Sequence, residues 1–423
     1  MPDLAQQIHE LGRRARAAAP LLALATTEQK NRSLLAIAEA LLAARVEILA
    51  ANAADVAAAE AAGLSGAMLD RLRLDEPRLT AMAAGVRGVA ELPDPVGRTL
   101  REWNHANGLR FAKVAVPLGV IGIIYESRPN VTSDAAALCL KAGNVVILRG
   151  GSESLRTNTA LAAALGRALV QSGLPADAVQ LVPMTDREAV KHLCGLSEFI
   201  DVIIPRGGRG LVETVMTHAR VPVIKHYDGI CALYVDVEAD LAMAGRILLN
   251  AKCQRPGVCN AVETLLVHEA VAAAFLAEAG PALRGRGVQL RCDDAALDLV
   301  GGEQAPEVMR AAPEDFRTEF LDLILAVKVV AGLEDAVAHI AANGSHHSDS
   351  IVTESTTTGE RFLAAVDSAT VYWNASTRFT DGSEMGFGAE IGISTDRLHA
   401  RGPMGLEELT TYKYIGRGTG QVR

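Results

Sequence analysis

The sequence predicts an α/β protein built on parallel β-sheets. From about residue 113 onward, short apolar runs that are typical of buried strands alternate with stretches of helical periodicity. Strands that alternate with helices require right-handed crossovers, and these produce a parallel sheet. The chain has 423 residues, of which 49% are hydrophobic, and this is enough for two or three packed units.

The elements follow in a clear order. Residues 1–88 are rich in alanine and repeat apolar positions at helical spacing, so they predict helices. The first group of predicted strands is 113–126, 144–151, 179–183, 199–208 and 221–226, and the helices between them are 132–143, 154–173, 186–196 and 211–219. A second β/α stretch has strands at 232–238, 262–268, 323–330, 347–355 and 369–376, with a helix near 269–280. Residues 410–418 form a β-prone tail. This strand would have exposed edges unless another strand pairs with it.

Composition excludes several classes of partner. The net charge of −9 and the aromatic content of 4% argue against a nucleic acid or an anionic membrane as the main partner. No apolar run reaches the roughly 18 residues of a membrane helix, and the N-terminus lacks the apolar stretch of a signal peptide. The six cysteines contain no CxxC pair, so we expect reduced thiols in a cytoplasmic protein.

Cys259 is the strongest candidate for a catalytic nucleophile. A reactive thiol needs an open, cation-bearing environment, and Lys252 and Arg255 lie close upstream. Pro256-Gly257 makes a bend that can lift a side chain out of a core. Asn260 follows, and either its backbone N–H or its side chain can stabilise a developing oxyanion. The alternative, a buried structural thiol, requires none of these neighbours.

Two glycine loops follow predicted strands and are candidates for a nucleotide site. The first contains Arg149, Gly150, Gly151 and Ser152, and the second contains Arg206, Gly207 and Gly208. Glycines let the backbone approach a ligand, the start of the following helix favours a phosphate, and arginines add charge. Neither loop has the GxGxxG pattern, so each alone also fits a simple turn.

Long segments around these residues resemble one enzyme family. The segment NAKCQRPGVCNAVETLLVH around Cys259 resembles the active-site segment of the gamma-glutamyl phosphate reductases (glutamate-5-semialdehyde dehydrogenases), a branch of the aldehyde dehydrogenase superfamily. Further matching segments are 116–151, 199–213, 336–351 and 371–414. The resemblance therefore covers nearly the whole chain.

The resemblance implies an aldehyde dehydrogenase-like fold with three parts. A Rossmann-type NADPH-binding domain is expected at 1–105 and 124–228, and an α/β catalytic domain that carries the Cys259 loop at 229–400. A β oligomerisation arm is expected at 106–123 and 401–423, which implies a homo-oligomer. The alternative for the terminal strand is pairing within its own subunit.

The resemblance also implies a reaction. It is the NADPH-dependent reduction of L-glutamyl 5-phosphate to L-glutamate 5-semialdehyde and phosphate through a thioacyl-enzyme on Cys259, the second step of proline biosynthesis. Functional coupling to glutamate 5-kinase is implied as well. Two alternatives remain: a non-phosphorylating semialdehyde dehydrogenase, and a catalytically silent homologue that only binds nucleotide or a partner.

The resemblance assigns further residues around this chemistry. Glu319 resembles a glutamate that meets the nicotinamide ribose, although a surface carboxylate also fits. The superfamily commonly has an oxyanion-binding asparagine near Ser127, and here serine replaces it. Arg128 and Asn130 can recognise the substrate together with Ser127, or this segment can simply start a helix.

Three more residues complete the predicted substrate site. Arg255 is a cation beside the thiol, Ser348 belongs to a polar loop, and Arg378 can clamp a substrate carboxylate. His346, His347 and Asp349 lie in the same polar loop, but adjacent residues point apart on a strand, so no metal site is predicted there.

A missing glutamate distinguishes this sequence from the hydrolytic members of the superfamily. Hydrolytic members carry a glutamate in an ELGGK stretch that activates water against the thioester. The comparable segment here, residues 225–236, contains no glutamate. This difference favours an acyl-thioester that exchanges with phosphate.

Overall fold

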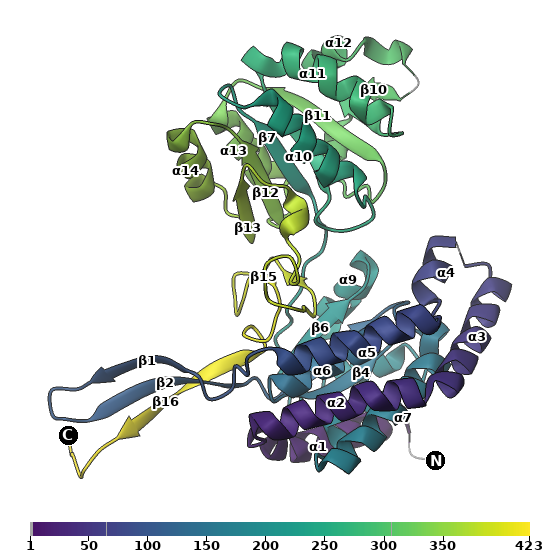
Figure 1. Ribbon diagram of the computed structural model, residues 1–423, viewed down its shortest axis with the longest axis vertical. Coiled ribbons are helices and arrows are strands. Elements are labelled where there is room, and N and C mark those ends of the chain that lie inside the picture. Colours follow the sequence, from purple (N-terminus) through teal and green to yellow (C-terminus); the bar gives the residue numbers. More distant parts are fainter. Residues whose placement is uncertain (1–2, 65, 306) are drawn as a thin grey trace. The chain divides into compact units, whose positions relative to one another are not determined.

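The computed structural model describes residues 3–64, 66–305 and 307–423, which divide into two compact units (Figure 1). Unit 1 comprises Met1–Lys225, Gly386–Gly392 and Met404–Arg423, and unit 2 comprises His226–Met385 and Ile393–Pro403. Each unit contains a parallel sheet with helices packed against it, so the predicted α/β class is confirmed. The predicted functional division of the chain into three parts stays a prediction.

Unit 1 begins with helices, as the alanine-rich periodicity predicts. They are α1 (Leu4–Ala23), α2 (Thr27–Ala43), α3 (Arg45–Ala61), α4 (Gly66–Leu72) and α5 (Glu76–Glu91). Local signals set their starts: Thr26 and Gln29 form a capping box before α2, and the Asp75 side chain accepts the Arg78 N–H at the start of α5.

The sheet of unit 1 has four parallel strands in the order β5-β4-β3-β6. The strands are β3 (Val120–Tyr125), β4 (Val145–Arg149), β5 (Val179–Leu181) and β6 (Val202–Arg206), and the connecting helices are α6 (Asn130–Lys141), α7 (Leu155–Ser172), α8 (Glu188–Cys194) and α9 (Arg209–His218). All six residues of β3 are buried, which explains why this strand reads as a continuous apolar run.

The prediction of a strand at 221–226 is wrong. Only Val223 forms a β-bridge there, with Ile203 of β6. Pro222 has no N–H to donate, and the segment makes just two backbone bonds around Ile203. A short apolar run with a proline inside it thus covers the edge of the sheet without extending it.

A separate antiparallel ribbon in unit 1 contains the C-terminal tail. It has the order β1-β2-β16, with β1 (Thr99–Asn104), β2 (Arg110–Pro117) and β16 (Thr410–Arg417). The tail pairs with β2 of its own chain over eight residues, from Thr410 opposite Pro117 to Arg417 opposite Arg110. This pairing covers one edge of β16 and leaves β16 at the border of the ribbon.

Aromatic side chains gather on this ribbon. The Trp103 ring stacks on Phe111 with centroids 5.5 Å apart, and the Tyr414 ring meets Trp103 edge-on at 5.9 Å. Tyr412 and Tyr414 nevertheless remain 47% and 61% exposed. Exposed aromatic rings along a border strand are typical of a surface that binds another chain.

Unit 2 is built on seven parallel strands in the order β10-β9-β11-β8-β7-β12-β13. The strands are β7 (Cys231–Val235), β8 (Val262–His268), β9 (Gln289–Cys292), β10 (Val308–Arg310), β11 (Ile324–Val330), β12 (Ser348–Val352) and β13 (Thr370–Trp373). The helices are α10 (Leu241–Cys253), α11 (Glu269–Arg284), α12 (Asp294–Leu299), α13 (Leu333–Asn343) and α14 (Thr356–Ala365). A short hairpin of β14 (Ile393–Ser394) and β15 (Gly402–Pro403) completes the unit.

Two hydrophobic cores lie on opposite faces of this sheet. Leu233 and Val235 of β7 pack into a core with α10, α11 and α12, while Tyr234 packs into another with α13 and α14. Alternate residues of a strand point to opposite faces, so helices cover the sheet on both sides, as Figure 1 shows. No helix among the described residues is long and apolar enough to cross a membrane.

We expect the chain to form a homo-oligomer through the β1-β2-β16 ribbon. Replacing Tyr414 with lysine puts a charge on the aromatic face without removing the strand, so the sedimentation mass at micromolar concentration should fall toward that of the monomer. Leu398→Lys is the matched control, because Leu398 is 85% exposed and lies outside the ribbon. A native chain that sediments as a monomer would contradict this expectation.

Candidate functional site

The two predicted glycine loops emerge at the same edge of the sheet in unit 1. They follow β4 and β6, which flank β3 in parallel register, so Gly150-Gly151 and Gly207-Gly208 both lie at the carboxyl ends of the strands. The segment that holds Ser127 follows β3 at the same edge. This is where open parallel sheets usually bind ligands.

Two glutamates tie these segments together. The Gly208 N–H donates to Glu126 Oε2 at 2.9 Å, and both the N–H and the hydroxyl of Ser127 donate to Glu153 Oε1 at 2.6 Å. A methyl group on Gly207 would lie 2.6 Å from Leu211 Cδ2 and closer still to Glu126 Oε2, so these side chains would have to move to make room for it. One at Gly208 would meet no atom within 4 Å, so open space remains at the start of α9.

The predicted phosphate partners differ in their surroundings. Arg149 is buried, and its guanidinium donates to the backbone carbonyls of Gly150 at 3.1 Å and Thr185 at 3.2 Å. Arg206 is half-buried, and its guanidinium lies against Gly392. Ser152 is exposed. Arg149 therefore shapes the loop through carbonyls of its own chain, a bonding pattern that its position after a strand does not reveal.

The predicted substrate residues Ser127, Arg128 and Asn130 belong to unit 1. The hydroxyl of Ser127 is engaged with Glu153, and Ser127 has a φ of +39°, a left-handed conformation that few serines adopt. The Asn130 amide donates to Asp134 Oδ2 at 2.8 Å. Arg255, Ser348 and Arg378, the other predicted substrate residues, belong to unit 2 with Cys259.

The Cys259 loop connects α10 to β8 and is held at its base by a buried ion pair. Lys252 Nζ lies 2.6 Å from Glu263 Oε2, and both side chains are fully buried. Burial raises the pKa of Glu263 and lowers that of Lys252, and the attraction between the two charges opposes both shifts. The pair joins the last turn of α10 to the second residue of β8, so it fixes both ends of the loop.

The loop lies at the amino ends of the strands in unit 2. Cys231 and Val262, the first residues of β7 and β8, are opposite each other, and Ser348 begins β12. Cys231 Sγ donates to the Cys259 carbonyl at 3.2 Å. A methyl group on Gly229 would lie 2.5 Å from Cys259 Cα, so only glycine permits this approach.

Two histidines that the sequence did not assign to the site lie beside the thiol. His226, His347 and Cys259 each offer one ligand atom, and these atoms lie within 4.8 Å of one another. His347 is fully buried; burial and then the neighbouring His226 lower its pKa to about 3, so the ring is neutral. His346 is exposed and bonds the Asp367 carbonyl at 2.9 Å, so the two adjacent rings do face apart.

Asn260 and Arg378 form a polar wall next to the thiol. The Asn260 amide donates to the Thr380 carbonyl at 2.8 Å, and Arg378 donates to Asn260 Oδ1 and, at 3.0 Å, to Gln254. The Asn260 side chain therefore holds the 378–380 segment against the loop. Burial and then the like charge of Arg255 lower the pKa of Arg378. Two guanidinium groups close together favour an anion between them.

Ser348, a predicted substrate residue, is buried, and Glu319, a predicted cofactor residue, is half-buried. The Ser348 hydroxyl is buried and donates to Thr380 Oγ1 at 2.7 Å. Glu319 is half-buried; burial raises its pKa, and a hydrogen bond from the Gly229 backbone opposes that shift. Glu319 thus contacts the segment that packs on Cys259, and it is not a simple surface carboxylate.

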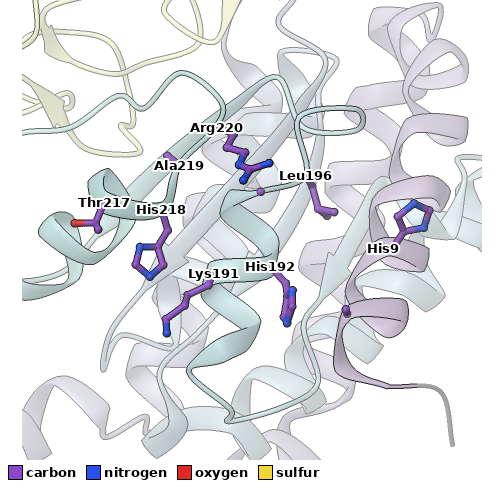
Figure 2. Close-up of a pocket in the computed structure, with 10 residues that line it drawn as sticks. His9, Lys191, His192, Leu196, Thr217, His218, Ala219 and Arg220 are labelled. Carbon is purple, nitrogen blue, oxygen red and sulfur yellow. The ribbon is translucent and has the colours of Figure 1, made fainter.

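Unit 1 also contains an open pocket of about 560 Å³, shown in Figure 2, and no residue of the glycine loops lines it. It is lined by basic side chains that include His9, Lys191, His218 and Arg220. Helix α9 starts at the Gly207-Gly208 loop and ends at His218, so the pocket lies at the opposite end of this helix. None of the predicted site residues lines it.

Comparisons with known proteins agree with this architecture. A model of the aldehyde dehydrogenase family matches residues 4–296. The gamma-glutamyl phosphate reductases of Opitutus terrae and Moorella thermoacetica are each 56% identical over 422 residues, covering 100% of this chain and 99% and 100% of those proteins. The crystal structure of the gamma-glutamyl phosphate reductase from Thermotoga maritima superposes with a TM-score of 0.96 at 45% identity, covering 98% of this chain and 99% of that one. An engineered glycolyl-CoA reductase with bound NADP⁺, 14% identical with a TM-score of 0.66, shares the fold.

The buried pair at the base of the loop generates a stability prediction. Glu263→Gln leaves the Lys252 ammonium buried without a carboxylate, so the free energy of unfolding should fall by about 3–5 kcal/mol. Replacing both residues together, as Lys252→Met with Glu263→Leu, should recover most of the loss. Denaturant unfolding measures both changes.

The control for this prediction is an exposed pair. Glu39 bonds Arg87 at 2.7 Å but is 72% exposed, so Glu39→Gln should cost at most about 1 kcal/mol. An equally small loss for Glu263→Gln would show that the buried pair does not hold the loop.

Proposed function

Because the chain belongs to the aldehyde dehydrogenase family and, within it, to the gamma-glutamyl phosphate reductases, we propose a reaction for it. The proposed reaction is the reduction of L-glutamyl 5-phosphate to L-glutamate 5-semialdehyde with NADPH. The reaction releases phosphate and is the second step of proline biosynthesis from glutamate. Glutamate 5-kinase would supply the acyl phosphate, and a cytoplasmic location fits these metabolites.

Cys259 is the proposed nucleophile. Its thiolate attacks the acyl carbon and forms a C–S bond. The bond between that carbon and the bridging oxygen then breaks, and phosphate leaves. The thiol is half-buried and lies in a loop next to Arg255 and Arg378. By contrast, burial raises the pKa of Cys253, which disfavours its thiolate.

A bound NADPH would supply the hydride by which the resulting thioester is reduced to a thiohemiacetal. Breaking the C–S bond then releases the aldehyde and regenerates the thiol. The Asn260 and Cys259 backbone N–H groups are the proposed donors to the oxyanion, because the Asn260 side chain is engaged with Thr380 and Arg378.

The residues of unit 1 fit a nucleotide phosphate. The start of α9 has open space at Gly208, and the dipole of a ten-residue helix favours an anion there. Gly150, Gly151, Ser152 and Gly207 form the rest of the proposed cofactor loops. The NADP⁺ bound to the engineered glycolyl-CoA reductase supports a nicotinamide cofactor for this fold.

The main support for a phosphorylating reaction is the composition of the segment that packs on the Cys259 loop. Gly229 and Cys231 contact the backbone of Cys259, and residues 225–236 contain no glutamate. A hydrolytic enzyme needs a carboxylate that activates water at this place. Asp228 is one methylene shorter than glutamate and is a poor substitute.

Cys259→Ala should abolish turnover, because no thioacyl-enzyme forms without the thiol. Cys253→Ala, six positions upstream, should keep most of the activity and serves as the matched control. The rate of NADPH oxidation with glutamyl 5-phosphate measures both. Comparable rates for the two variants would refute the assignment of the nucleophile.

In the reverse direction, reduction of NADP⁺ by glutamate semialdehyde should depend on phosphate. Without phosphate, the thioester persists and NADPH formation should stop after about one turnover per site. Adding phosphate should restore steady turnover. Sustained turnover in phosphate-free buffer would favour the alternative, a non-phosphorylating semialdehyde dehydrogenase.

A further inference from the structure

The Cys259 thiol and two histidines beside it offer the donor set of a transition-metal site. Cys259, His226 and His347 come from three separate segments of unit 2, and one ligand atom of each lies within 4.8 Å of the other two. We propose that they bind a borderline-soft divalent cation of the zinc class, which masks the nucleophile and holds the enzyme reversibly inactive.

The hydrogen bonds of His226 prepare one ring nitrogen for a metal. Its Nδ1 lies 2.8 Å from the Ile393 carbonyl oxygen, which can only accept. In the neutral form of this ring, the proton is therefore on Nδ1 and the lone pair is on Nε2. A backbone carbonyl that orients the ring in this way is the usual outer partner of a metal-binding histidine.

The bonds of His347 lead to the same tautomer. Its Nδ1 lies 2.9 Å from Ser348 Oγ, and the only proton of that hydroxyl is donated to Thr380 Oγ1 at 2.7 Å. Nδ1 must then be the donor to Ser348, so Nε2 again carries the lone pair. In the neutral form of either ring, Nε2 is thus the nitrogen whose lone pair can bind a metal.

His347 Nε2 is the observation that points to a ligand. The ring is fully buried, and among the described residues this nitrogen has no hydrogen-bond partner. A buried polar atom without a partner is destabilising. A cation bound between His347, His226 and the thiol would satisfy this atom.

The geometry selects the class of ion. Zinc holds sulfur at about 2.3 Å and nitrogen at about 2.0–2.1 Å in a tetrahedron, which separates its ligands by about 3.3–3.6 Å. The three ligand atoms lie within 4.8 Å of one another, so they must move closer together to reach this spacing. One sulfur and two nitrogens suit zinc, cobalt or cadmium better than magnesium or calcium, which prefer oxygen.

Binding requires no oxidation or reduction. The thiol releases its proton to water, one metal–sulfur and two metal–nitrogen bonds form, and the fourth position stays open to water. The sulfur lone pair is then committed to the metal and cannot attack a carbonyl carbon. Arg378 lies near the thiol, and its positive charge limits the affinity, so the metal can leave again.

The test is a titration of the full-length protein with Cd²⁺, followed by the ultraviolet charge-transfer band of the cadmium–thiolate bond. We expect one equivalent to produce the band in the native chain and in Cys253→Ser, the matched control. Cys259→Ser should lose the band. His226→Ala and His347→Gln should each weaken binding by more than about 100-fold, because losing a ligand costs more than losing an outer partner, for which 10–100-fold is usual.

Two results would overturn the site. One is an unchanged band in Cys259→Ser, which would assign the metal to another thiol, such as Cys231. The other is native affinity in both histidine variants. Circular dichroism checks the fold of His347→Gln, and the half-buried His226 provides the second variant if that chain does not fold. The cadmium titration measures binding and does not depend on the proposed reaction, so failure of the reaction and absence of the metal site can be distinguished. In an active enzyme, Zn²⁺ should inhibit turnover, and a chelator should restore the rate.

Discussion

The ion pair between Lys252 and Glu263 lies at the base of the Cys259 loop, where both side chains are fully buried. Each charge is acceptable in the core only because the other is 2.6 Å away. Lys252 is the next-to-last residue of α10 and Glu263 is the second residue of β8, so the pair fixes the two ends of the loop between them. The position of the thiol, the contacts of Asn260 and the approach of residues 226–231 all depend on this fixed loop.

The two units separate the tasks that the proposed reaction requires. Unit 1 presents glycine loops at the carboxyl ends of its parallel strands, the edge that most nucleotide-binding sheets use. Unit 2 presents the thiol at the amino ends of its strands, where the loop from α10 enters β8. The two units therefore use opposite edges of their own sheets, although both sheets are parallel.

Much of this arrangement could be predicted from the sequence, because it depends on local patterns. The alternation of apolar runs and helical stretches predicts the parallel sheets, and the neighbours of Cys259 single it out among six cysteines. His226 and His347 could not be assigned in this way, because their position beside the thiol results from the order of β7, β8 and β12 in the sheet. The bonds of Arg149 to the carbonyls of Gly150 and Thr185 were equally hidden, and Pro222 prevented the strand expected at 221–226.

In the proposed reaction, an acyl group resides on Cys259 and leaves to phosphate. The most direct measurement is peptide mass spectrometry of the enzyme after incubation with glutamate semialdehyde and NADP⁺ in phosphate-free buffer. We expect one glutamyl adduct per chain, on the peptide that contains Cys259, and this adduct should persist in buffer and disappear when phosphate is added. An adduct on another residue, or one that water removes as fast as phosphate does, would contradict the proposed reaction.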